Sequence, residues 1–127
     1  MLETKTEGPR NLAFVLSEGN GKISRDVVII AEGAGKLEPG TVLGQITASE
    51  KYVASPNAEV VGAEGAETAS AVLAYGVDAT NADVEAVVVK RQAEVKAPML
   101  IFDASVNDAT KTAAKHTQLA AVTIIAR

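Results

Sequence analysis

The chain has 127 residues, a formal net charge of −4, and no cysteine or tryptophan. The absence of cysteine excludes disulfide bonds and thiolate metal sites. The acidic balance argues against nucleic acid or an anionic membrane as a partner, because such polyanions attract basic surfaces. Hydrophobic residues make up 47% of the sequence but aromatic residues only 3%. We therefore expect an aliphatic core that gains further burial from partner subunits.

The first eleven residues are polar and are broken by Gly8 and Pro9. This composition predicts a flexible arm over residues 1–11, followed by a single domain over residues 12–127. The arm lacks the apolar region of a secretory signal, and no apolar run approaches the ~20 residues that span a bilayer. We therefore expect the protein to be synthesised in a cytoplasm.

Short apolar runs separated by turn residues fill the next part of the chain. Residues 12–16 (LAFVL) and 26–31 (DVVIIA) are expected strands, and the breaker-rich stretch between residue 32 and residue 41 is an expected loop. Residues 42–47 and 52–53 flank a tight turn at 49–51, which predicts a hairpin.

A Gly-, Ala- and Glu-rich stretch, residues 56–68, is expected to form a surface loop with room for a short strand at Val60 and Val61. Two β-branched runs follow, residues 71–77 and 84–91, separated by the polar cluster DATNAD. This arrangement predicts two strands that pair with each other.

The clearest helix is expected over residues 108–118, with Asn107 or Ser105 as its cap and Lys115 near its negative end. Its apolar face would consist of alanines, namely Ala109, Ala113 and Ala120. A final strand is expected over residues 121–126. Many short strands, one clear helix and no regular repeat predict a mainly β or α+β fold and not a parallel α/β sheet.

The residues that usually carry catalysis or metal binding do not form a recognisable pattern. Two Gly-Lys pairs, at residues 21–22 and 35–36, lack the upstream glycine and following Ser or Thr of a phosphate-binding loop. His116 is the only histidine, and a solvated helix residue or a polar packing contact explains it. Asp78 and Asp83 are expected to make turn hydrogen bonds. We expect no enzyme activity, no metal and no cofactor.

One alternative remains open. Residues 38–46 (EPGTVLGQI) followed by a hairpin that bears Lys51 are similar to half of a biotinyl or lipoyl carrier domain. Such carriers present a modified lysine at a hairpin tip, but they need a second matching half, and none is found in this sequence. A shared hairpin geometry explains the likeness without a cofactor.

As a whole, the sequence resembles the lambda-type bacteriophage head decoration proteins. The resemblance is spread over weak motifs in a given order: KISRD (22–26), LEPGTVLGQIT (37–47), AVLAYGVDATNADVEAVVVK (71–90) and NDATKTAAKHTQLAAVTIIAR (107–127). It implies a compact fold of short strands, of β-clip or β-tulip type, with one or two short helices. It also implies a homotrimer that binds the major capsid protein on the outside of the expanded head and braces the shell against DNA pressure.

The resemblance assigns a capsid-binding role to the amino-terminal arm, which adds a strand to the capsid protein. Backbone hydrogen bonds would give affinity and alternate side chains would fill pockets. The residues expected to bind the capsid in this way are Leu12, Ala13, Phe14, Val15 and Leu16. An internal strand of the folded domain is an equal alternative for these residues. With Leu12, Phe14 and Leu16 on one side, the strand would be amphipathic.

A second apolar run combines one of the two phenylalanines with one of the two methionines. Core packing is its simplest explanation, and a subunit interface is a close rival because apolar groups concentrate at interface centres. The candidate interface residues are Pro98, Met99, Leu100, Ile101 and Phe102.

Overall fold

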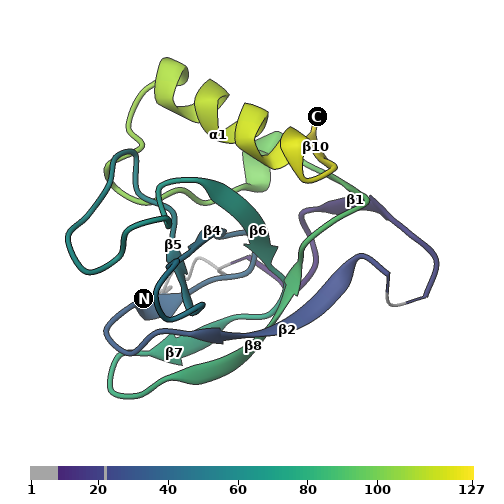
Figure 1. Ribbon diagram of the computed structural model, residues 1–127. Helices are drawn as coiled ribbons and strands as arrows, with labels where there is room; N and C mark the ends of the chain where they lie inside the picture. Colours follow the sequence, from purple (N-terminus) through teal and green to yellow (C-terminus); the bar gives the residue numbers. More distant parts are fainter. Residues whose placement is uncertain (1–8, 22) are drawn as a thin grey trace, which may run out of the picture.

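The computed structural model of the protein describes residues 9–21 and 23–127, and Figure 1 shows their arrangement. Strands dominate the regular structure, and the described residues form one α-helix. The expected mainly β or α+β class is therefore confirmed. Of the predicted arm, residues 1–11, the first eight lie outside the described residues.

A closed five-stranded barrel forms the centre of the molecule. Its strands are β2 (Arg25–Ile30), β4 (Val42–Gln45), β5 (Tyr52–Ala54), β6 (Ala69–Leu73) and β8 (Val84–Val89). Their order around the barrel is β2-β5-β4-β6-β8. β2 and β8 pair along their whole antiparallel length, whereas β2 and β5 meet only at Ile30 and Tyr52. Valine and isoleucine fill β2 and β8, as suits a pleated surface that is buried on one side.

Three smaller units surround the barrel. Strands β1 (Val15–Glu18), β9 (Ala93–Val95) and β10 (Ile124–Ala126) form a sheet with β9 in the middle. Strands β3 (Gly35–Leu37) and β7 (Val77–Ala79) form an antiparallel pair. A short 3-10 helix, η1 (Ala97–Met99), precedes the helix α1 (Ala109–Ala121), which lies along the top of the view in Figure 1.

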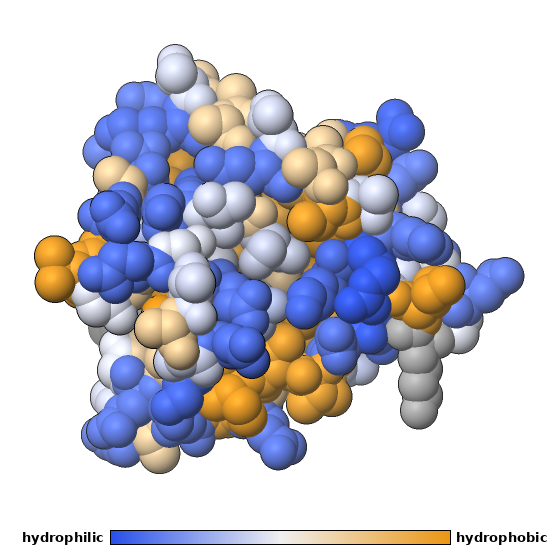
Figure 2. Space-filling view, in the orientation of Figure 1, coloured by the Kyte–Doolittle hydropathy of each residue, from blue (hydrophilic) through white to orange (hydrophobic). Residues whose placement is uncertain are grey.

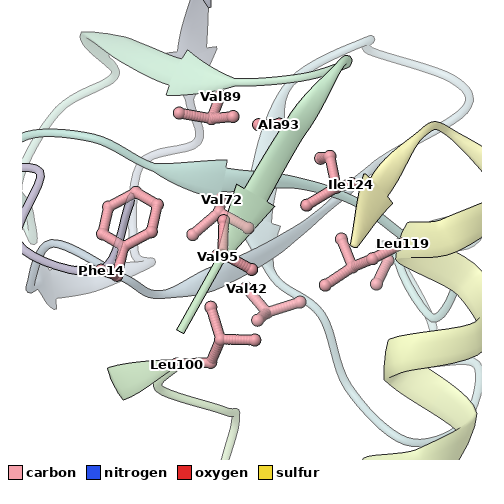
Figure 3. Packing of buried hydrophobic residues seen from close by; sticks show 10 residues of the cluster. Phe14, Val42, Val72, Val89, Ala93, Val95, Leu100, Leu119 and Ile124 are labelled. Carbon is pink, nitrogen blue, oxygen red and sulfur yellow. The ribbon is translucent and has the colours of Figure 1, made fainter. Parts of the chain in front are cut away.

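Two hydrophobic clusters hold these units together. One fills the barrel and includes Leu43, Leu73 and Val88. The other lies between the barrel, the three-stranded sheet and α1, and Figure 3 shows its side chains converging from all three units. Neighbouring residues Val88 and Val89 enter different clusters because successive side chains of a strand point to opposite faces.

Two predicted pairings are confirmed. The hairpin forms between β4 and β5, with Leu43 opposite Ala54, and the tight turn includes Glu50 at a φ of 62°. The two β-branched runs also meet, because Val72 of β6 pairs with Val89 of β8. The β4–β5 hairpin follows from a strong local signal for strand and turn.

Several predicted boundaries are wrong. The run 71–77 is interrupted at residues 74–76, so that β6 joins the barrel while β7 leaves it to pair with β3 inside the predicted loop. Val60 and Val61 form no strand, and the last strand begins at Ile124. These differences arise from pairing between segments distant in sequence, which local propensity does not encode.

The helix is confirmed, but its cap and its buried face differ from the prediction. Asp108 itself is the N-cap, and its side chain accepts a hydrogen bond from the Lys111 N–H at 2.8 Å. The helix extends to Ala121 and buries Lys115 and Leu119. The predicted apolar face is wrong, since each of its three residues is exposed: Ala109, Ala113 and Ala120.

Candidate interaction surfaces

The predicted capsid-binding run, residues 12–16, is divided between a turn and a strand. Leu12 adopts a φ of 61° and donates its N–H to the Ala74 carbonyl at 3.1 Å. Phe14 is 1% exposed and belongs to the cluster beneath the three-stranded sheet. Leu16 lies at a bulge in β1 and is 48% exposed. The expected alternation, with Phe14 and Leu16 on one side, is therefore wrong.

Strand β1 lies at an edge of its sheet. It pairs with β9 on one side only, with Val15 opposite Val95 and Glu18 opposite Ala93. An edge strand offers backbone N–H and C=O groups to a further strand from another chain. Leu16 and Ser17 are exposed beside this edge.

The second candidate interface, residues 98–102, is largely used within the subunit. Leu100 is buried, and Met99 and Phe102 pack against the same cluster as Phe14. Ile101 forms a bridge to Thr41 of the β3–β4 connection. Pro98 remains exposed.

His116 packs close to the second candidate interface. Its ring centroid lies 6.0 Å from that of Phe102, and its buried Nε2 atom has no hydrogen-bond partner. His116 is thus a packing residue, and the contact that it makes is with an aromatic ring.

The most unusual buried group is Lys115, which lies in the middle of α1 and not near its negative end as predicted, because the helix continues to Ala121. Its side chain is 1% exposed, and its Nζ atom donates to three oxygens at the base of the β5–β6 loop. These are the Ser55 Oγ at 2.9 Å, the Pro56 carbonyl at 2.6 Å and the Glu67 carbonyl at 2.5 Å. A buried ammonium is tolerated when its donors are satisfied in this way.

Burial also changes the acid–base behaviour of this lysine. Loss of solvent lowers the pKa of Lys115 from its usual value of 10.5, while the carboxylates of Glu67 and Asp103 oppose the shift. The spacing of Lys115 and Leu119 by four residues, on one helix face, is the only sequence signal for this burial.

The β5–β6 loop also sits directly on the barrel. A side chain at Gly44 of β4 would meet the Ala66 carbonyl at 1.9 Å, so only glycine fits beneath the loop. The Ser55 Oγ donates to the same carbonyl at 2.7 Å. The loop is thus fixed at its base by β4 on one side and by α1 on the other.

Lys51, the lysine of the possible carrier hairpin, is held by an ion pair. Its Nζ lies 2.6 Å from the Asp83 Oδ2, and the Asp83 Oδ1 accepts the Glu32 N–H. The Lys51 hydrogen bond and the Glu32 N–H lower the pKa of Asp83 from 3.8. Asp78 accepts from the N–H and hydroxyl of Thr80, which confirms the turn hydrogen bonds expected for it. The same expectation is wrong for Asp83, whose two partners are distant in the sequence.

Acidic residues are concentrated in one part of the chain. Residues 52–89 contain no lysine or arginine but several carboxylates: Glu59, Glu64, Glu67, Asp78, Asp83 and Glu85. Across residues 9–21 and 23–127, no group of three or more His, Asp or Glu side chains is placed to hold a metal ion. Within the same ranges, no helix is long and apolar enough to cross a membrane.

Comparison with known proteins identifies one family. The sequence model described as bacteriophage lambda head decoration protein D matches residues 4–124 of the chain, nearly its whole length. No curated protein matches the sequence. The family is one of structural phage capsid proteins and not of enzymes, and its role is decoration of the phage head.

Proposed function

The chain belongs to the bacteriophage lambda head decoration protein D family, and we propose that it binds the outer surface of the expanded head as a homotrimer. It occupies threefold and quasi-threefold positions and braces the shell against the pressure of packaged DNA. Its partners are the major capsid protein and two further copies of itself. The family match over residues 4–124 carries this proposal. Synthesis in the host cytoplasm precedes attachment to the virion.

The physical properties of the chain support a bracing role. Bracing requires contact area and stiffness and does not require reactive groups. The barrel is closed, and the β5–β6 loop contacts both β4, at Gly44, and α1, through Lys115. A net charge of −4 gives the protein no attraction for the packaged DNA.

For capsid attachment we propose the amino-terminal segment together with the free edge of β1. Phe14 anchors this segment to the core, and Leu16 is exposed beside the unpaired edge. Residues 1–11 then serve as the arm, and the free edge of β1 extends the capsid-binding surface that the arm begins. Strand addition suits this edge because it supplies backbone hydrogen bonds in a regular row.

For subunit contact, residues 98–102 remain a candidate through the exposed ring of Pro98 and the half-exposed side chains beside it. Leu100 is already buried within its own subunit, so it would hold these residues in position and not touch the second subunit itself.

The test is binding of the purified protein to expanded and unexpanded heads, measured by co-sedimentation. We expect binding to expanded heads alone, together with greater resistance of those heads to heat or chelator. Equal binding to both forms contradicts the proposal.

A truncation tests the arm. Deletion of residues 1–8 should preserve the melting temperature, because it spares Phe14, while reducing head binding at least tenfold. Deletion through residue 16 is unsuitable because it removes a core side chain. Unchanged head affinity of the shorter truncation contradicts a role for the arm.

A further inference from the structure

The turn between β1 and β2 carries the sequence Asn20-Gly21, and no other asparagine of the chain precedes a glycine. Both residues are exposed, and Gly21 adopts a φ of 62° with open space around the position that a Cβ would take. The turn lies at the right of the view in Figure 1, where Figure 2 shows hydrophilic side chains projecting into solvent. Asparagine and glycine favour turns, and exposed turns are where covalent change is best tolerated.

The base of this turn is held more firmly than its tip. The Gly19 N–H donates to the Ser24 Oγ at 2.7 Å and to the Gln92 carbonyl at 3.0 Å. Among the described residues, neither the side-chain amide of Asn20 nor the N–H of Gly21 has a hydrogen-bond partner. The two groups that would react with each other are thus adjacent and exposed at the tip, while the strands on either side stay in place.

Asparagine is a thermolabile residue, and one that precedes a glycine is able to lose its side-chain nitrogen as ammonia. The Gly21 nitrogen attacks the Asn20 Cγ atom, and a bond forms between these two atoms. The bond from Cγ to the side-chain nitrogen breaks, and that nitrogen leaves as ammonia with the proton of the Gly21 N–H. A side chain on the second residue would hinder the attack, and glycine has none. The product is a succinimide ring in the main chain.

Water then opens the ring and completes the change. Its hydroxyl adds to one of the two ring carbonyls, the bond from that carbon to the nitrogen breaks, and the nitrogen regains a proton. Opening at the former side-chain carbonyl gives aspartate. Opening at the former main-chain carbonyl gives isoaspartate, in which the main chain passes through the former side chain. Water is the only co-reactant, and no oxidant or reductant takes part.

We propose that Asn20 is a site of spontaneous deamidation in the folded protein, with aspartate and isoaspartate as its products. Asn20 belongs to neither hydrophobic cluster, so the reaction does not need the core to open. Either product makes the net charge of −4 more negative by one unit. The new carboxylate lies two positions from Glu18, whose carboxylate binds Arg25 at 2.8 Å, and isoaspartate lengthens the turn by one methylene. This modification is independent of the proposed role on the capsid.

The other asparagines of the chain are placed less favourably for this reaction. The side-chain oxygens of Asn11 and Asn107 each accept a hydrogen bond, which restrains their amides. Asn81 is exposed like Asn20, but it precedes an alanine, whose Cβ hinders attack by the backbone nitrogen. Asn81 therefore serves as a control within the same molecule, because it differs from Asn20 in the residue that follows.

Peptide mapping tests the site. The purified full-length protein is kept folded at mildly alkaline pH, and mass spectrometry with fragmentation locates each asparagine that has become an acid. We expect Asn20 to be converted at least ten times faster than Asn81. The converted peptide should also accept a methyl group from an isoaspartyl methyltransferase, which does not modify ordinary aspartate. A rate for Asn20 no higher than that for Asn81 overturns the proposal, and so does a converted peptide that the methyltransferase leaves unmodified.

Two substitutions separate the reaction from the shape of the turn. Gly21→Ala retains Asn20 and adds a methyl group for which there is open space, although alanine is less stable than glycine at this positive φ. It should slow the conversion of Asn20 at least tenfold. Asn20→Ser keeps a residue that favours turns and should remove the acidic form that isoelectric focusing detects in the natural protein. With melting curves to check that both variants are folded, conversion of Gly21→Ala at the natural rate overturns the proposal, as does an undiminished acidic form in Asn20→Ser.

Discussion

The Nζ atom of Lys115 lies 2.9 Å from the Oγ atom of Ser55, and both side chains are buried. The two residues are separated by 60 positions in the sequence. Ser55 in turn donates to the Ala66 carbonyl, which rests on Gly44 of the barrel. This chain of contacts joins α1, the β5–β6 loop and β4 into one unit.

Removing the lysine should therefore destabilise the fold. In Lys115→Met, which keeps most of the volume, three buried oxygens lose their donor, and we expect a loss of about 1–3 kcal/mol in the free energy of unfolding. Urea denaturation measures this loss. Lys111→Met on the same helix is the control, and its effect should stay within about 0.5 kcal/mol because Lys111 is only partly buried. Equal effects of the two substitutions would show that the buried hydrogen bonds of Lys115 contribute nothing to the free energy of unfolding.

The stability of the natural protein should also depend on pH through Lys115. Its pKa is lowered in the folded state below the value of 10.5 that applies to the unfolded chain. Between these two values the unfolded state binds more protons, so folding stability contributed by this group rises with pH. Subtracting the pH profile of Lys115→Met isolates the effect. A difference between the two proteins that falls as the pH approaches 10.5 would refute the assigned direction.

Adding one methyl group at Gly44 should displace the β5–β6 loop. The new Cβ would lie 1.9 Å from a backbone carbonyl, so Gly44→Ala is expected to cost about 1–3 kcal/mol, which thermal unfolding can measure. Gly76→Ala is the matched control, since its new Cβ would meet its nearest atom at 3.4 Å. Similar melting temperatures for both variants would mean that the β5–β6 loop can move away from β4 without loss of stability.

The amino-terminal run should contain one core residue and one surface residue. Phe14→Ala is expected to lower the free energy of unfolding by about 3–5 kcal/mol, because a buried ring leaves a cavity. Leu16→Ala should change stability by less than about 0.5 kcal/mol and should instead reduce head binding. If Leu16→Ala unfolds the protein as readily as Phe14→Ala, the exposed position of Leu16 is wrong.

The sequence by itself determined the features that depend on neighbouring residues. Turn residues between two apolar runs determined the β4–β5 hairpin, and two apolar runs with β-branched residues indicated β6 and β8. An aspartate followed by alanines, lysines and threonines determined the helix, although the cap was assigned to the wrong residue. The order of weak motifs along the chain was sufficient to indicate the family.

Only the tertiary structure decided which side chains are buried. Alanines such as Ala113 lose little when exposed, so the orientation of α1 follows Leu119 and the oxygens that receive Lys115. Phe14 turns inward because the sheet of β1, β9 and β10 covers a cluster that no local pattern reveals. Burial is set by contacts between segments far apart in the sequence, and those contacts exist only once the barrel has closed.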